Sequence, residues 1–249
     1  MCHFKDIPGA LKRLRKPPDS SILWPFSEYG AAMALAIFDL DNTLIAGDSD
    51  YSWGEFLVAQ GRVDPVQYKM MNEKFYQDYQ RGRLDIREYL DFALQPLAKL
   101  EREELAVLHR QFMAEVIQPM WLPAALSLLQ KHRQRGDFLL VITSTNRFVV
   151  EPICSRLGVD DLLATELATR EGRYTGEVEG EPTFREGKVS RLHQWLADTG
   201  HTLEGSYFYS DSINDLPLLE VVDNPVAVDP DEALADIAAQ RNWSIISLR

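Results

Sequence analysis

AIFDLDNTL, residues 36–44, is the segment around which the rest of the chain is arranged. The apolar residues Leu35 to Phe38 predict a short buried strand, and Asp39 and Asp41 follow it directly. Because side chains alternate along a strand, these two aspartates start on the same face. Two crowded carboxylates repel each other unless a cation or a proton lies between them. The segment, which continues to Thr43, therefore predicts a functional site at the end of a strand.

The composition limits the class of protein to which such a site belongs. With 249 residues, 45% of them hydrophobic and 26% charged, the chain is typical of a globular protein with one large or two modest domains. The net charge of −12 disfavours nucleic acid as a partner, since such binding depends on clustered lysine and arginine. The longest apolar run near the start, Ala31 to Leu40, is about half a membrane span and contains Asp39. We therefore expect neither a nucleic-acid nor a membrane partner.

The two cysteines, Cys2 and Cys154, lie far apart in the sequence. They indicate neither a disulfide framework nor a cysteine-type zinc site, which favours the cytoplasm. The five histidines show no spacing typical of metal ligands.

Helical periodicity without a convincing strand extends from Tyr51 to Gln118. Breaks near Gly61–Pro65, Gly82, Pro96 and Pro119 divide it into four expected helices. Their aromatic stripes, which include Phe75, Tyr79 and Tyr89, favour a bundle core over a binding platform.

From Leu122 onward, strands and amphipathic helices alternate, with a polar hairpin at 171–181. The expected strands are Phe138–Ile142, Leu162–Leu167, Ser206–Tyr209, Val226–Val228 and Trp243–Ile246, and the expected helices are Ala124–Arg135, Arg147–Leu157, Lys188–Thr199, Leu216–Val222 and Asp231–Gln240.

This order predicts an α/β fold: a Rossmann-like parallel sheet core with helices on both faces, plus an inserted helical-bundle cap. We expect an α/β core at 33–46 and 120–249 and a helical cap at 47–119. Residues 1–32 form a flexible N-terminal extension in this interpretation. Because the folded pattern begins just after Met33, we also expect Met33 to be the true start.

Polar residues follow three of the predicted strands, and the carboxyl ends of parallel strands meet at one edge of a sheet. A lysine that opens a helix can reach the same edge. The residues in question are Asp39, Asp41, Thr143, Ser144, Thr145, Asn146, Lys188, Ser210, Asp211, Asn214 and Asp215. Carboxylates in oxygen-rich surroundings suit Mg²⁺. A lysine, a hydroxyl and backbone amides hold phosphate oxygens, and one aspartate can attack phosphorus while another moves protons. Together they predict phosphoryl transfer through an aspartyl-phosphate.

Each of these pieces also has a simpler interpretation. Aspartate and threonine after a strand favour turns and helix caps, which applies to Asp39–Thr43, to Thr143 and to the pair Asp211 and Asp215. Lys188 alone is typical of a solvated helix residue. Their joint occurrence, in this order and at predicted strand ends, favours the functional interpretation.

The motifs DLDNT (39–43), VITS (141–144), a lone Lys188 and SDSINDLP (210–217) resemble those of the haloacid dehalogenase-like hydrolase superfamily. The helical insert resembles the cap of its phosphoserine phosphatase-like branch, and the resemblance covers residues 34–247. It implies Asp39 as nucleophile and Asp41 as general acid/base. It also implies Mg²⁺ at Asp39, the main-chain carbonyl of Asp41, and Asp211, with Asp215 supporting the metal's waters. Phosphate binding would fall to Thr143, Ser144, Lys188 and Asn214.

Departures from the family pattern bear on the substrate. Phosphoserine phosphatases usually have Ser-Gly-Gly after the second strand, where this chain has Thr143-Ser144-Thr145. Asp48 lies where that branch reads the substrate's amino group, with Asp50 as a second candidate and Arg147 as a further pocket residue. No clear match exists for the arginine that holds phosphoserine's carboxylate. A solvated loop acid is the alternative for Asp48, and a solvated helix start is the alternative for Arg147.

The function expected from the sequence is that of a Mg²⁺-dependent phosphomonoesterase acting on a small phosphorylated metabolite. An amino-alcohol phosphate such as histidinol phosphate fits Asp48. Phosphoserine phosphatase, a phosphotransferase and a non-catalytic phosphate-binding module stay open as alternatives. The oligomeric state is not indicated by the sequence.

Overall fold

The computed structural model describes residues 34–249. The expectations for residues 1–32 and for Met33 lie outside the described residues. The described residues belong to one compact unit. Among them, we find no helix with the length and apolar character needed to cross a bilayer.

The centre of the fold is a six-stranded parallel sheet in the order β3-β2-β1-β6-β7-β8. β1, the strand predicted from the opening segment, lies between β2 and β6 and is buried along its whole length. β1 is parallel to both neighbours, so the carboxyl ends of β1, β2 and β6 lie at the same edge of the sheet. The strands are β1 (Leu35–Phe38), β2 (Phe138–Asn146), β3 (Asp161–Thr165), β6 (Tyr207–Ser210), β7 (Asn224–Val228) and β8 (Ser244–Ile246).

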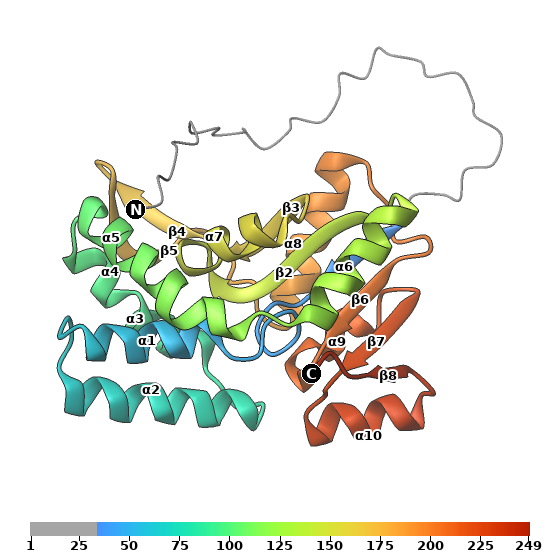
Figure 1. The fold of residues 1–249 in the computed structure, drawn as a ribbon, viewed down its shortest axis with the longest axis horizontal. Coiled ribbons are helices and arrows are strands. Elements are labelled where there is room, and N and C mark those ends of the chain that lie inside the picture. Colours follow the sequence, from blue (N-terminus) through green and yellow to red (C-terminus); the bar gives the residue numbers. More distant parts are fainter. Residues whose placement is uncertain (1–33) are drawn as a thin grey trace, which may run out of the picture. The chain divides into compact units, whose positions relative to one another are not determined.

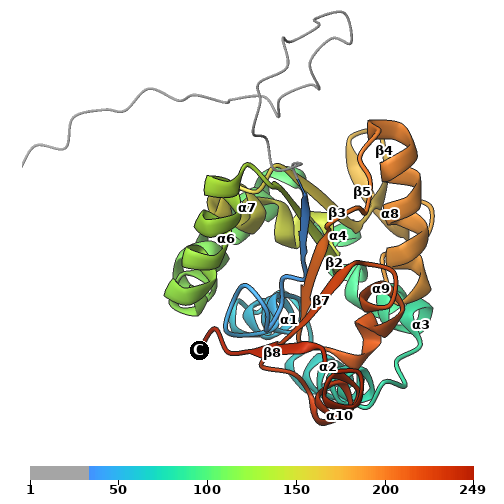
Figure 2. The same cartoon turned by 90° about the vertical axis from the view of Figure 1, so that its right-hand side faces the viewer.

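Helices cover both faces of this sheet, as Figure 2 shows for α6 and α7 on one side and α8 and α9 on the other. Ala36 and Phe38 pack on the side of α6 and α7, and Leu35 and Ile37 on the side of α8, α9 and α10. This alternation is the strand periodicity of a sheet buried on both faces. The helices are α6 (Pro123–Arg135), α7 (Arg147–Leu157), α8 (Glu186–Thr199), α9 (Leu216–Leu219) and α10 (Glu232–Gln240). The predicted fold class is confirmed.

The segment between β1 and β2 is helical, as predicted (Figure 1). The third expected helix is divided at Leu94, because Pro96 has no amide hydrogen to continue α3 and instead lies in the first turn of α4. The elements are α1 (Ser49–Ala59), α2 (Pro65–Gln80), α3 (Ile86–Ala93), α4 (Gln95–Lys99), α5 (Arg102–Phe112), a π-helix η1 (Met113–Ile117) and a 3-10 helix η2 (Gln118–Met120). Asp48, Asp64 and Asp85 cap α1, α2 and α3 through their side chains.

The helical insert and the sheet share one hydrophobic cluster. Trp53, Phe56 and Phe112 of the insert belong to the same buried cluster as Phe38 of β1. The division into a core and a cap domain stays a prediction. A hairpin is present, but it begins earlier than the expected range of 171–181: it is the antiparallel pair β4 (Leu167–Arg170) and β5 (Arg173–Val178).

Candidate active site

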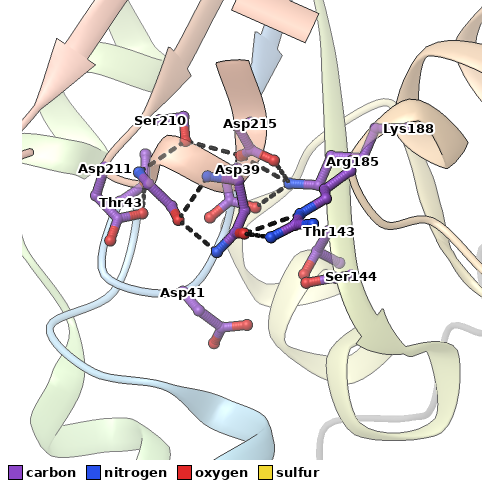
Figure 3. A network of polar contacts seen from close by, with 12 residues as sticks. Asp39, Asp41, Thr43, Thr143, Ser144, Arg185, Lys188, Ser210, Asp211 and Asp215 are labelled. Carbon is purple, nitrogen blue, oxygen red and sulfur yellow. Dashed lines mark hydrogen bonds and ion pairs between the residues drawn. The ribbon is translucent and has the colours of Figure 1, made fainter. Parts of the chain in front are cut away.

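A buried lysine joins the end of β1 to the segment after β6. The Nζ atom of Lys188 lies 2.7 Å from Oδ1 of Asp39 and 2.7 Å from Oδ1 of Asp215 (Figure 3). Burial alone would lower the pKa of Lys188, but Asp215 and Asp39 outweigh it and hold this pKa above its ordinary value. The lysine is therefore a fixed positive charge beside Asp39.

Asp215 is held by its own donors. The hydroxyl of Ser210 donates to Oδ2 of Asp215 at 2.7 Å, and Lys188 contacts both carboxylate oxygens. These contacts point to a role in holding Lys188. The role of Asp215 at a metal stays a prediction.

Asp39 and Asp211 form the acidic side of the site. Thr43 donates to Oδ1 of Asp211 at 3.1 Å, so the opening segment contacts the segment after β6 (Figure 3). Burial raises the pKa of Asp39 to about 7, with Lys188 opposing and Asp215 and Asp41 adding to the rise. Burial, followed by the charges of Asp39 and Asp215, also raises the pKa of Asp211 well above its ordinary value. The carboxylates repel one another in this arrangement, which is the condition that a bound cation relieves.

Asp41 is held apart from this ion-pair network. The amide of Ser49, in the first turn of α1, donates to Oδ1 of Asp41 at 2.6 Å. The hydroxyl of Thr145 donates to Oδ2 at 2.9 Å. Burial and the neighbouring charge of Asp48 raise the pKa of Asp41 to about 7, and the donors at Ser49 and Thr145 oppose that rise. A carboxyl group with this pKa can both give and take a proton near neutral pH.

β2 extends further than predicted, to Asn146 instead of Ile142. Its pairing with β3 shifts register between Ile142 and Asn146, where the polar residues 143–146 continue the strand. Thr143 is buried, and its hydroxyl accepts from the amide of Thr145 at 3.2 Å. Ser144 lines the pocket described next. Figure 3 draws Thr143 and Ser144 together with Lys188, and α8 packs against β2, so the predicted phosphate-binding residues come from elements in contact.

A pocket between the insert and the sheet edge contains four aspartates and no lysine or arginine within the part of the chain that the structure describes. Asp39 and Asp41 follow β1, and Asp48 and Asp50 lie at the start of α1. The remaining lining residues are Tyr51, Asn72, Phe75, Tyr76, Tyr79, Leu84, Ile86, Tyr89, Ser144 and Thr145. Phe75, Tyr79 and Tyr89, predicted as bundle core, therefore also line a pocket.

Asp48 and Asp50 are pocket residues with structural contacts of their own. Asp48 caps α1 by accepting from the amide of Tyr51 at 2.8 Å, and Asp50 accepts from the Asn146 side chain at 3.2 Å. Burial raises the pKa of both to about 7. Asp48 is therefore not the solvated loop acid that the sequence left open.

Arg147 is not among the residues that line the pocket, which corrects its interpretation as a pocket residue. Its Nε lies 2.8 Å from Oε2 of Glu166, one terminal nitrogen lies 2.7 Å from Oε1, and the same nitrogen donates to the carbonyl of Leu162 at 2.9 Å. The bidentate carboxylate of Glu166 and the carbonyl of Leu162 thus engage Nε and one terminal nitrogen of the guanidinium away from the pocket.

Asn214 contacts the helical insert. Its amide donates to the carbonyl of Tyr79, at the end of α2, at 3.0 Å, and its oxygen accepts from Nε of Arg185 at 3.1 Å. Arg185 also donates to the carbonyl of Gly82. The predicted phosphate-binding role of Asn214 stays a prediction. Arg185 itself was missed, because one arginine before Lys188 has no motif or periodicity to mark it.

Comparison with known proteins gives the family. A model of the haloacid dehalogenase-like hydrolases matches residues 36–220. The chain belongs to this family. A histidinol-phosphatase from Neisseria meningitidis serogroup C (strain 8013) is 50% identical over 219 residues, which are 86% of this chain and 99% of that protein.

Solved structures of similar proteins agree with the fold. A protein of unknown function from Bordetella pertussis Tohama I is 45% identical, with a TM-score of 0.82 over 87% of this chain and 99% of that one. A phosphoserine phosphatase solved as a phospho-aspartyl intermediate analogue is 20% identical, with a TM-score of 0.65 over 87% and 94%. The predicted family and enzyme class are confirmed, and the fold agrees with that of the phosphoserine phosphatase: this family member is a phosphatase.

Proposed function

We propose that this phosphatase hydrolyses a small phosphate ester that carries a cationic amine, and that the ester is histidinol phosphate. The observation that carries the proposal is the pocket with four aspartates and, among the described residues, no basic side chain in its lining. Such a pocket favours a cation and disfavours a second anionic group beyond the phosphate. The 50% identity to a histidinol-phosphatase supports the same substrate.

The first chemical step is assigned to Asp39. Lys188 holds Oδ1 of this carboxylate, and we assign attack on phosphorus to Oδ2. A bond forms between Oδ2 and phosphorus while the bond from phosphorus to the ester oxygen breaks. Lys188 and the Thr143 hydroxyl would stabilise the phosphoryl oxygens. The products of this step are an aspartyl-phosphate on Asp39 and the alcohol.

Asp41 is assigned the proton transfers. In its protonated form it gives its proton to the departing ester oxygen, which needs one because an alkoxide is a poor leaving group. The resulting carboxylate then takes a proton from the water that attacks the aspartyl-phosphate. The bond between phosphorus and Asp39 breaks, which releases inorganic phosphate and restores both side chains.

A magnesium ion fits the donors present. Within residues 34–249, no group of three or more Asp, Glu, His or Cys side chains is arranged to hold a metal alone. Mg²⁺ needs fewer protein ligands, because it keeps several waters and binds substrate phosphate oxygens. Asp39, Asp211 and the main-chain carbonyl of Asp41 would hold it. When bound, it would neutralise charge on the transferring phosphoryl group.

The part of the pocket that residues of α1, α2 and α3 line is assigned to the rest of the substrate. Asp48 and Asp50 would pair with the amine, and the tyrosines of α2 and α3 would contact the imidazole ring. Phosphoserine is the second candidate within this branch. Its carboxylate would enter a pocket that already holds four acidic side chains, which costs free energy unless an arginine compensates.

A phosphate-release panel with Mg²⁺ tests this assignment. We expect kcat/KM to be highest for histidinol phosphate, lower for phosphoserine and lowest for glucose 6-phosphate. Asp39→Asn should abolish release from each ester and prevent trapping of the aspartyl-phosphate, which assigns the activity to this site. A preference for phosphoserine or for the sugar phosphate would reject the proposed substrate. Product analysis with an added alcohol separates hydrolysis from phosphotransfer.

The cytoplasm remains our proposed location, on the basis of cysteine usage alone.

A further inference from the structure

The carboxylate of Asp41 is clamped from two directions. The amide of Ser49 binds Oδ1 from the helical insert, and the hydroxyl of Thr145 binds Oδ2 from β2. The two donors occupy different oxygens, so together they define the plane of the carboxylate as well as its position. Asp41 is the residue to which the proton transfers are assigned.

Only one of these two donors belongs to a side chain. The Ser49 donor is a main-chain amide, which every residue except proline supplies. The Thr145 donor is a side-chain hydroxyl on a residue that is 5% exposed, and Asp41 is its hydrogen-bond partner. The sequence had already marked Thr145 as a departure from Ser-Gly-Gly, since glycine has no side chain to offer here.

We propose that Thr145 is a positioning residue for Asp41, and that it determines how well the ester oxygen is protonated as it leaves. This inference rests on the proposed function, because it takes Asp41 as the general acid. The hydroxyl holds the carboxyl group at the site where a proton must be delivered. Proton transfer requires heavy atoms within hydrogen-bond reach, so a carboxyl free to rotate would meet the leaving oxygen less often.

The main chain of Thr145 has a separate task. Its amide donates to the hydroxyl of Thr143, a predicted phosphate ligand. A substitution of the Thr145 side chain leaves this amide in place. Phosphate binding and proton delivery are therefore separable at this one residue.

Thr145→Val and Thr145→Ser form a matched pair for the test. Valine keeps the shape and β-branching that suit a strand, whereas serine keeps the hydroxyl. Two probes are measured with Mg²⁺: the alkyl phosphate that the panel ranks first, and p-nitrophenyl phosphate, whose leaving group departs without a proton. For T145V we expect kcat/KM on the alkyl ester to fall roughly 10- to 100-fold, within the range of general acid catalysis, and on p-nitrophenyl phosphate by less than about 3-fold. T145S should recover most of the loss.

A double-mutant cycle with Asp41→Asn completes the test. If Thr145 acts through Asp41, T145V should add less than about 2-fold on the alkyl ester in the D41N background. Equal losses on both probes, or no recovery in T145S, would overturn the inference. If D41N loses activity mainly on the alkyl ester but T145V does not, the role of Thr145 is overturned and the acid role of Asp41 stands. D41N without that dependence would overturn the acid role of Asp41 and this inference with it.

Discussion

Lys188 compensates the charges of two carboxylates at once. It is buried between Asp39 and Asp215, and each of these carboxylates is buried as well. Removing one partner of a buried ion pair leaves an uncompensated charge, whereas removing both partners costs much less. This asymmetry makes the lysine a structural element as well as a predicted phosphate ligand.

Lys188→Met should therefore destabilise the protein by about 3 kcal/mol or more, in addition to abolishing activity. The free energy of unfolding is measured by urea denaturation. The double substitution Lys188→Met with Asp215→Asn should regain part of that stability, because one of the two orphaned carboxylates is then neutral. A double variant that is less stable than K188M would contradict the compensation described here.

Asp48 and Asp50 tie substrate affinity to pH. Burial raises the pKa of both to about 7, so they lose their negative charge as the pH falls through 7. For a cationic substrate, KM should rise about 10-fold or less between pH 8 and pH 6 as these counter-charges disappear. Phosphate esters without an amine should not show this rise beyond their own ionisation.

Asp48→Asn provides the comparison for this dependence. It should raise KM for the amine-bearing ester at pH 8 and flatten its pH profile, while KM for p-nitrophenyl phosphate stays close to that of the unmodified protein. Equal changes for both esters would argue against amine recognition by Asp48.

Arg185 connects elements that are far apart in sequence. It precedes α8, contacts Asn214 of the 3-10 helix η3 (Ile213–Asp215), and donates to the carbonyl of Gly82 in the turn between α2 and α3. Asn214 in turn donates to the carbonyl of Tyr79. The turn that follows α2 is thereby fastened to the sheet edge beside the pocket.

Arg185→Ala should loosen this turn. We expect faster amide hydrogen exchange over 79–85 and a KM increase of a few-fold, since the tyrosines of α2 would be less well placed. Arg83→Ala is the matched control, because Arg83 lies in the same turn but pairs with Asp78 at the exposed surface. Similar exchange rates in the two variants would show that the Arg185 contacts do not hold the turn.

The sequence predicts elements well where one pattern dominates. The apolar run before Asp39 and the switch from helices to alternating strands and helices both follow from burial, so the parallel sheet is recovered. The polar residues 143–146 look like a loop, yet they extend β2, because a register shift against β3 lets polar residues continue the strand. Arg147 was predicted to be a pocket residue, but it pairs with Glu166 instead. Tertiary packing brings these two residues together, and the sequence does not reveal that pairing. The contacts of Arg185 arise in the same way.

For the whole molecule, the clustered aspartates link stability to both protons and Mg²⁺. Asp39, Asp41, Asp48 and Asp50 have folded-state pKa values near 7, against 3.8 in the unfolded chain. Between pH 6.5 and 8 the folded state therefore binds more protons than the unfolded state, and stability falls as the pH rises through 7. His109 and His132, whose pKa is lowered by burial, act in the opposite sense below about pH 6.5.

Without metal, the Tm should accordingly be higher at pH 6.5 than at pH 8. Adding Mg²⁺ should raise the Tm more at pH 8, where the carboxylates are ionised and repel one another, than at pH 6.5, where protons compete with the metal. Differential scanning calorimetry at both values, with and without Mg²⁺, measures the four melting points. Asp211→Asn should remove most of the Mg²⁺-dependent increase, because this carboxylate is a proposed ligand. An increase that is equal at both pH values would contradict the linkage between metal and protons at this site.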